Sequence, residues 1–148
     1  MTEVSFHFNA AEPLGYTCRL LRKAWRSGSR VAVTGPAATL GELDRQLWTF
    51  DPHEFLPHAR LAAGSAPGPL HRRTPLWLVD DAGDAALASG AFGVLVNLGA
   101  EPVPEADRFA RLIEVVSTEP GERDAARRRW KHYAAGGHAV TGHDVGAA

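Results

Sequence analysis

Alternating strand and helix patterns in the N-terminal third of the chain constrain its fold most. Residues 4–8 alternate apolar and polar side chains with the period of a strand, and residues 16–27 place apolar side chains at helical spacing. A β-branched run at 30–34 predicts a buried strand, and residues 39–48 predict a helix that begins with a capping box. Right-handed crossovers make such alternating strands parallel. The sequence therefore predicts an α/β fold with a mostly parallel sheet flanked by helices.

The rest of the chain extends this pattern after a long loop. Residues 50–74 are rich in Pro, Gly, His and Arg and predict a loop of the kind that often carries function. Strands are then expected at 76–79 and 93–98, and helices at 105–112 and 119–135. For residues 115–116 two alternatives stay open, the end of a helix or a short edge strand.

Length and composition bound the domain organisation. The 148 residues, 45% of them hydrophobic and 22% charged, suit one domain and exclude a disordered chain. We expect a single α/β domain over residues 1–137 and a partly flexible tail at 138–148. Cys18 is the single cysteine, which excludes an internal disulfide. Without a long apolar run or the features of a signal peptide, the sequence favours a cytoplasmic protein that does not contact a membrane.

The motifs of nucleotide and metal chemistry are missing where this fold would place them. Residues 9–15 hold one Gly and a Pro where a dinucleotide fingerprint needs three spaced Gly residues. Residues 35–39 lack the Gly-Lys-Ser/Thr of a phosphate-binding loop, and DDAGD at 80–84 is typical of a solvated turn. We therefore expect no phosphate-binding loop, no cofactor, no metal and no catalytic residues.

Charge is segregated along the chain, although the total is only −1. Residues 16–31 hold five basic residues and no acidic one. Residues 77–120 hold eight acidic residues against two basic ones, a balance of −6. The total argues against a protein that coats nucleic acid, so binding is expected at local surfaces.

The strongest local signal is the last expected helix. Between residues 121 and 133 five basic residues stand against two acidic ones, a balance of +3. Arg123, Arg127 and Lys131 are four residues apart and form a stripe, beside an aromatic side that holds Trp130. This surface is either a solvated face beside a packing side or a binding site. As a site, it suits an acidic peptide with a hydrophobic end, or single-stranded nucleic acid.

A second candidate surface lies where the helix at 39–48 meets the long loop. Trp48 follows Leu47 directly, so both side chains cannot point fully inward with equal ease. Trp48 and Phe55 are therefore either core residues or, if exposed, anchors of a protein interface.

Several motifs together resemble one known family. Residues 43–48 read LDRQLW and 55–58 read FLPH, which resembles the LDxxLW…FxPH signature of the chi subunit of bacterial DNA polymerase III. The basic helix ending in AWRSG, the Gly64…Pro67-Gly68 loop and the terminal pattern from Trp130 to Gly136 are similar to the same family in the same order. The resemblance covers nearly the whole chain.

The resemblance implies a Rossmann-like fold that binds no nucleotide, in a non-catalytic accessory subunit of the clamp-loader complex in DNA replication. Members of the family bind the acidic, Phe-ending C-terminal tail of the single-stranded DNA-binding protein, and so reach single-stranded DNA indirectly. They also pair with the psi subunit. The positions that match the tail site are Arg123, Arg127, Trp130 and Lys131, and those that match the psi surface are Trp48 and Phe55.

Three departures from the family and two alternative functions accompany this interpretation. The segment just before Arg123 is shorter than in the family. The family's usual Tyr is Trp130 here, and the chain after Gly137 lacks the more hydrophobic family ending. One alternative is a direct single-stranded DNA-binding module that uses the last helix, whose affinity would grow with oligonucleotide length. The other is a degenerate nucleotide-binding enzyme with a ligand at the strand ends, which a thermal-shift screen with nucleotides would reveal.

Overall fold

The computed structural model describes residues 2–53, 55–62, 68–69, 73–80, 92–104 and 106–146. The predicted turn residues 81–84 and the loop positions Gly64 and Pro67 lie outside these ranges. The elements, in chain order, are β1 (Glu3–Ala10), α1 (Pro13–Arg26), β2 (Val31–Thr34), α2 (Ala37–Thr49), β3 (His58–Leu61), β4 (Leu76–Val79), β5 (Val94–Asn97), the 3-10 helix η2 (Ala106–Arg108), β6 (Arg111–Ser117), α4 (Pro120–Ala135) and β7 (Ala139–Asp144). Across the described ranges, each helix is too short or too polar to span a bilayer.

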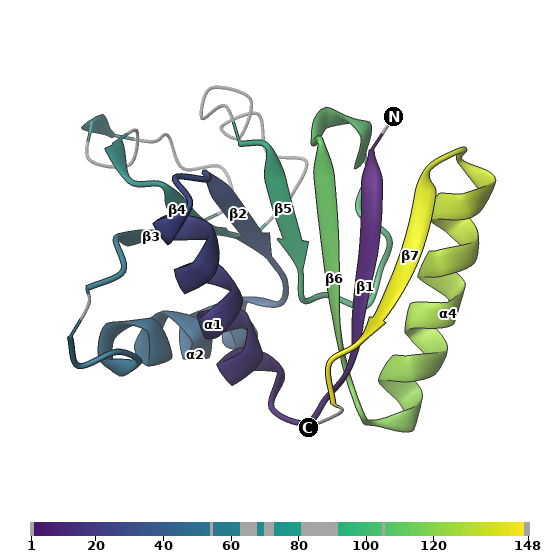
Figure 1. The fold of residues 1–148 in the computed structure, drawn as a ribbon, viewed down its shortest axis with the longest axis horizontal. Coiled ribbons are helices and arrows are strands. Elements are labelled where there is room, and N and C mark those ends of the chain that lie inside the picture. The colour runs from purple at the N-terminus through teal and green to yellow at the C-terminus, as the bar shows by residue number, and fades with distance from the viewer. Residues whose placement is uncertain are drawn as a thin grey trace.

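The described strands form one seven-stranded parallel sheet in the order β3-β4-β2-β5-β6-β1-β7. Helices α1 and α2 cover one face of this sheet, and α4 covers the other beside β6, β1 and β7 (Figure 1). This arrangement confirms the predicted Rossmann-like α/β fold with a parallel sheet flanked by helices.

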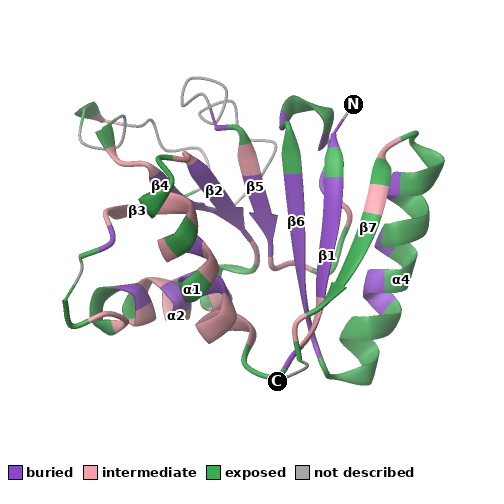
Figure 2. Cartoon of the chain, in the orientation of Figure 1, coloured by how far each residue is buried: buried purple, intermediate pink, exposed green. Residues whose placement is uncertain are grey.

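Each face of the sheet has its own hydrophobic core. Val4 and Phe6 of β1 pack with Tyr133 of α4, which confirms the period of two predicted for this strand. On the opposite face, Leu21 of α1 and Leu43 of α2 pack on strands β2, β4 and β6. Figure 2 shows the central strands buried, while β7 and the outer side of α4 stay exposed.

The helix predicted at 105–112 is wrong. Of its described residues, only those of η2 are helical, and from Arg111 the chain forms β6, a central strand between β5 and β1. Leu112 packs under α4 while Ile113 packs on the other face, so this strand is buried on both sides. A strand that is buried on both faces lacks the alternation of apolar and polar residues that marks a half-buried strand. Its apolar residues also fit the spacing of a short helix.

Two strands lie in segments that the sequence indicated as irregular. β3 falls inside the predicted loop at 50–74 and pairs with β4. β7 falls inside the predicted tail at 138–148 and pairs in parallel with β1 from Glu3 to Phe8. The sheet therefore extends past the predicted domain boundary at residue 137. Because β7 is an exposed edge strand of small and polar residues, it lacks the apolar pattern by which strands are recognised.

The helix ends agree only in part with the sequence signals. Gly28, with a φ of +81°, follows the C-cap of α1 as predicted. The capping box predicted from Thr39 is wrong, because α2 begins at Ala37 without any side-chain cap. In α4 the carboxylate of Glu119 accepts hydrogen bonds from the backbone N–H groups of the first turn. This cap fixes the N-terminal end of the helix that carries the candidate site.

Candidate peptide pocket and aromatic pair

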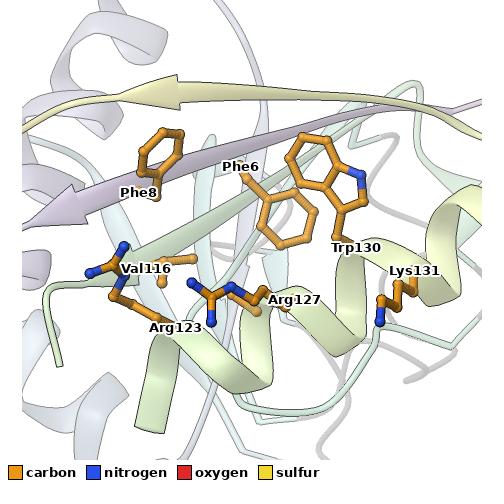
Figure 3. Close-up of a pocket in the computed structure, with 8 residues that line it drawn as sticks. Phe6, Phe8, Val116, Arg123, Arg127, Trp130 and Lys131 are labelled. Atoms are coloured by element: carbon orange, nitrogen blue, oxygen red, sulfur yellow. The ribbon is translucent and has the colours of Figure 1, made fainter. Parts of the chain in front are cut away.

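A hollow of about 370 Å³ lies between α4 and the sheet (Figure 3). All four residues predicted from the last helix line it, so the structure brings Arg123, Arg127, Trp130 and Lys131 together. The sequence analysis missed the residues that complete the lining, which are Phe6 and Phe8 of β1, Val116 of β6 and Ala126 of α4. The alternation in residues 4–8 places Phe6 and Phe8 on one face of β1, but which helix covers that face depends on the chain topology.

Aromatic rings form the apolar wall of this pocket. The rings of Trp130 and Phe6 pack with centroids 5.1 Å apart, and Trp130 remains 36% exposed. Gly142 of β7 lies behind them, because a Cβ there would stand 3.2 Å from Phe8 Cε1 and 3.3 Å from Trp130 Cζ3. The small residue in the edge strand therefore leaves room for both rings.

The rim of the pocket is cationic. Arg127 Nη1 lies 2.9 Å from Asp124 Oδ1, and both side chains are solvent-exposed. Within the described ranges, neither Arg123 nor Lys131 has an acidic partner. Figure 3 shows Arg123 below Phe8 and Trp130 beside Phe6, so positive charge adjoins the apolar hollow. An anionic group with an apolar neighbour matches this arrangement.

Arg129 belongs to the core and not to the basic surface. Its side chain is 4% exposed, and its Nε donates to Glu114 Oε1 at 3.0 Å while Nη1 donates to the Ala100 carbonyl oxygen at 3.1 Å. The hydroxyl of Tyr133 donates to Glu114 Oε2 at 2.6 Å, and the Asn97 amide donates to both carboxylate oxygens. This buried network fastens α4 to β6 and thereby holds the pocket in shape.

Burial shifts the pKa values of two members of the network. Burial and the adjacent Glu114 carboxylate raise the pKa of Tyr133, so its hydroxyl stays a donor. Burial also raises the pKa of Glu114, while the Arg129 guanidinium opposes that shift. The only signal of this network in the sequence is a charged residue inside the apolar run of β6.

Trp48 and Phe55 form an exposed aromatic pair, whereas Leu47 is buried. Trp48 is 58% exposed and Phe55 57%, and their ring centroids lie 5.3 Å apart. The His58 ring supports Trp48 edge-on at 4.9 Å. His58 Nδ1 donates to the Leu56 carbonyl oxygen at 2.7 Å, which fixes the orientation of the ring. The structure therefore excludes a core position for both rings, and their role as interface anchors stays a prediction.

The edge of the sheet where doubly wound folds bind nucleotides has the wrong charge for phosphate. A hollow of about 230 Å³ lies beyond the C-terminal ends of β2 and β5. Asp80 and Glu101 line it, and none of its described lining residues is basic. In the part of the chain that the structure describes, no three His, Cys, Asp or Glu side chains gather where a metal could bind.

Fold and site together define a Rossmann-like α/β protein that carries an apolar hollow with a cationic rim instead of a phosphate-binding loop. The family model for the DNA polymerase III chi subunit, HolC, matches residues 1–141. The DNA polymerase III subunit chi of Pseudomonas aeruginosa is 34% identical over 148 residues, which cover 97% of this chain and 96% of that protein. The subunit of the same name from Haemophilus influenzae is 30% identical over 133 residues, which cover 87% of this chain and 85% of that protein. The chain therefore belongs to the chi subunit family of DNA polymerase III, accessory subunits of DNA replication.

Proposed function

We propose that the chain is a non-catalytic clamp-loader subunit that links the replicase to the single-stranded DNA-binding protein. Its pocket under α4 would hold the acidic, Phe-ending C-terminal tail of that protein, at the replisome in the cytoplasm. The observation that carries the proposal is the position of Arg123, Arg127 and Lys131 at the rim of an apolar hollow. A peptide that combines carboxylates with a terminal aromatic side chain complements both features.

The pocket divides the recognition between its wall and its rim. The terminal Phe ring of the tail would enter the hollow against Phe6 and Trp130, and its carboxylate would lie near Arg127. Aspartates earlier in the tail would contact Arg123 and Lys131. Each exposed ion pair contributes roughly 0.2–1 kcal/mol, so we expect a complex of micromolar affinity that weakens as salt is added.

Fluorescence anisotropy with a labelled tail peptide tests this proposal. Arg127→Ala and Trp130→Ala are expected to weaken binding, whereas Arg128→Ala should leave it unchanged, because Arg128 is exposed on the same helix outside the pocket lining. A peptide with Ala in place of its terminal Phe should bind more weakly than the natural one. Equal affinities for wild type, Arg127→Ala and Trp130→Ala would reject the site.

We further propose that the psi subunit binds at the aromatic pair of Trp48 and Phe55. Exposed aromatic side chains of this size are typical anchors, and a buried Trp at an interface is worth roughly 2–4 kcal/mol. Co-purification with psi should fail for Trp48→Ala and survive in Trp130→Ala, while tail binding shows the opposite pattern. Loss of both interactions in Trp48→Ala, with an intact circular dichroism spectrum, would contradict two separate surfaces.

Direct binding of single-stranded DNA by α4 is the second candidate. The exposed Trp130 ring beside Lys131 favours it, because bases stack on aromatic rings next to cations. The hollow of about 370 Å³ favours a single terminal side chain over a run of stacked bases. Affinity that grows with oligonucleotide length and disappears in Trp130→Ala would support the DNA-binding candidate.

A further inference from the structure

A second cavity, of about 380 Å³, lies on the face of the sheet opposite α4. Its floor is apolar and includes Val94, Val96 and Ile113 of strands β5 and β6. The wall is α1, which leads from β1 to β2 past the intervening strands β6 and β5 (Figure 1). The cavity is therefore separated from the peptide pocket by the whole sheet.

Among the residues that the structure describes, three cationic side chains and no acidic one line this cleft. They are Arg19 and Lys23 of α1 and Arg111 of β6. Over the described ranges none of the three forms an ion pair. Arg22 on the same helix differs, because it pairs with Asp51 at 3.2 Å. Helix α1 thus directs unpaired charge to the cleft.

Polar groups at both sides of the cleft add hydrogen-bonding capacity. His7 Nδ1 and the Tyr16 hydroxyl are hydrogen-bonded to each other on one side, and the hydroxyls of Ser27 and Ser29 lie 3.1 Å apart on the other. Hydroxyl groups of this kind can donate to phosphate oxygens.

The shifted pKa values around the cleft indicate that its charges converge. Burial raises the pKa of Tyr16, while the guanidinium groups of Arg19 and Arg111 both oppose the rise. Burial, His143 and Arg111 lower the pKa of His7 to about 4. Glu3 stands opposite Arg111 in the strand register, and the Glu12 carboxylate lies near the Arg19 guanidinium at Gly15, but neither residue lines the cleft. The cleft is therefore a positively charged cavity with an apolar floor.

We propose that this cleft is a second ligand site, which takes a nucleotide unit. The phosphate lies at Arg19, Lys23 and Arg111, whose guanidinium and ammonium groups suit phosphate oxygens. The base and sugar lie on the floor of Val94, Val96 and Ile113, and the cavity volume is that of a small-ligand site. Two sources supply this chemistry, a phosphodiester in single-stranded DNA and a free mononucleotide.

The cleft offers a peptide side-chain contacts alone. Strands β5, β6 and β1 are hydrogen-bonded to neighbours on both sides, so no strand edge in the cleft can pair with a peptide backbone. A nucleotide needs only donors for its phosphate and an apolar surface for its base. The cationic cleft offers both.

Anisotropy with a labelled oligothymidylate of roughly 12 nucleotides tests the site, with thymidine monophosphate as competitor. One neutralised phosphate predicts a slope of about −0.7 for log K against log salt, or roughly threefold weaker binding between 50 and 200 mM salt. Arg111→Ala should weaken binding about tenfold, because the phosphate loses one charge-assisted donor, and Lys23→Glu should abolish binding. Arg128→Ala and the tail-pocket variant Arg127→Ala should bind like wild type.

The outcomes separate the sources and can overturn the proposal. If thymidine monophosphate competes at concentrations comparable to those of the oligonucleotide, the ligand is a free nucleotide. If it competes only weakly, the ligand is single-stranded DNA. In either case, binding should perturb the His7 imidazole resonances in NMR spectra, because His7 lines the cleft. Absence of binding to both probes would overturn the site. The proposal would also be overturned if Arg127→Ala abolished binding while Arg111→Ala did not. Binding of an acidic peptide in the cleft, without binding of either nucleotide probe, would overturn it as well.

Discussion

Replacing Arg129 by Met removes the cation that pairs with the fully buried Glu114 carboxylate. The substitution keeps a long apolar side chain in place while Glu114 loses its Nε donor and the Ala100 carbonyl oxygen loses a second donor. Breaking a buried ion pair by removing one partner costs about 3–5 kcal/mol. For a chain of 148 residues, this corresponds to a melting temperature lower by roughly 10 °C.

Urea unfolding followed by circular dichroism measures this loss. The double variant Glu114→Leu/Arg129→Met removes both charges, so much of the lost stability should return. Asn97 and Tyr133 would still lack their carboxylate acceptor, which is why recovery should be incomplete. A loss below about 1 kcal/mol in Arg129→Met would refute the reasoning, because the Glu114 carboxylate would then not depend on Arg129.

The remaining predictions concern the pocket, its edge and the opposite face. Asp124→Asn should strengthen tail-peptide binding about twofold in anisotropy, because it releases Arg127 from a pair worth a few tenths of a kcal/mol. Gly142→Leu should weaken tail binding while circular dichroism stays unchanged, since its side chain would crowd Trp130 and Phe8. His7 has a pKa near 4 when folded against 6.5 when unfolded, so its contribution to stability is complete above pH 6.5 and is lost as pH falls toward 4. Urea unfolding should show a loss of at most about 2 kcal/mol between pH 7.5 and 5 that His7→Gln lacks, and identical pH profiles would contradict the assignment.

Sequence patterns predicted the helices and strands that bury one face or that lie between clear turn signals. α1, β2, β4 and α4 were all expected near their observed positions. β6 was not, because a strand buried on both faces reads as an apolar run whose length and spacing also fit a helix. β7 was missed for the opposite reason, since an exposed edge of small polar residues is stabilised by pairing with β1 and not by its own apolar face.

The candidate site was likewise predictable only in part from the sequence. Helical spacing alone grouped Arg127, Trp130 and Lys131, because one helix carries them. The apolar half comes from β1 and β6, which lie far away in sequence and meet α4 only through the sheet topology. Spacing also could not show that Arg129 turns inward to Glu114 while its neighbour Arg128 stays exposed.

A double-mutant cycle between Arg127 and the C-terminal carboxylate of the tail peptide tests the central claim most directly. The four affinities combine wild type and Arg127→Ala with the natural peptide and its C-terminal amide, all measured by anisotropy at low salt. A direct contact at the exposed rim predicts a coupling energy of about 0.5–1 kcal/mol, and the same cycle with Arg128→Ala should give none. Coupling indistinguishable from zero for Arg127, with binding otherwise intact, would contradict a tail whose end lies in the pocket beneath α4.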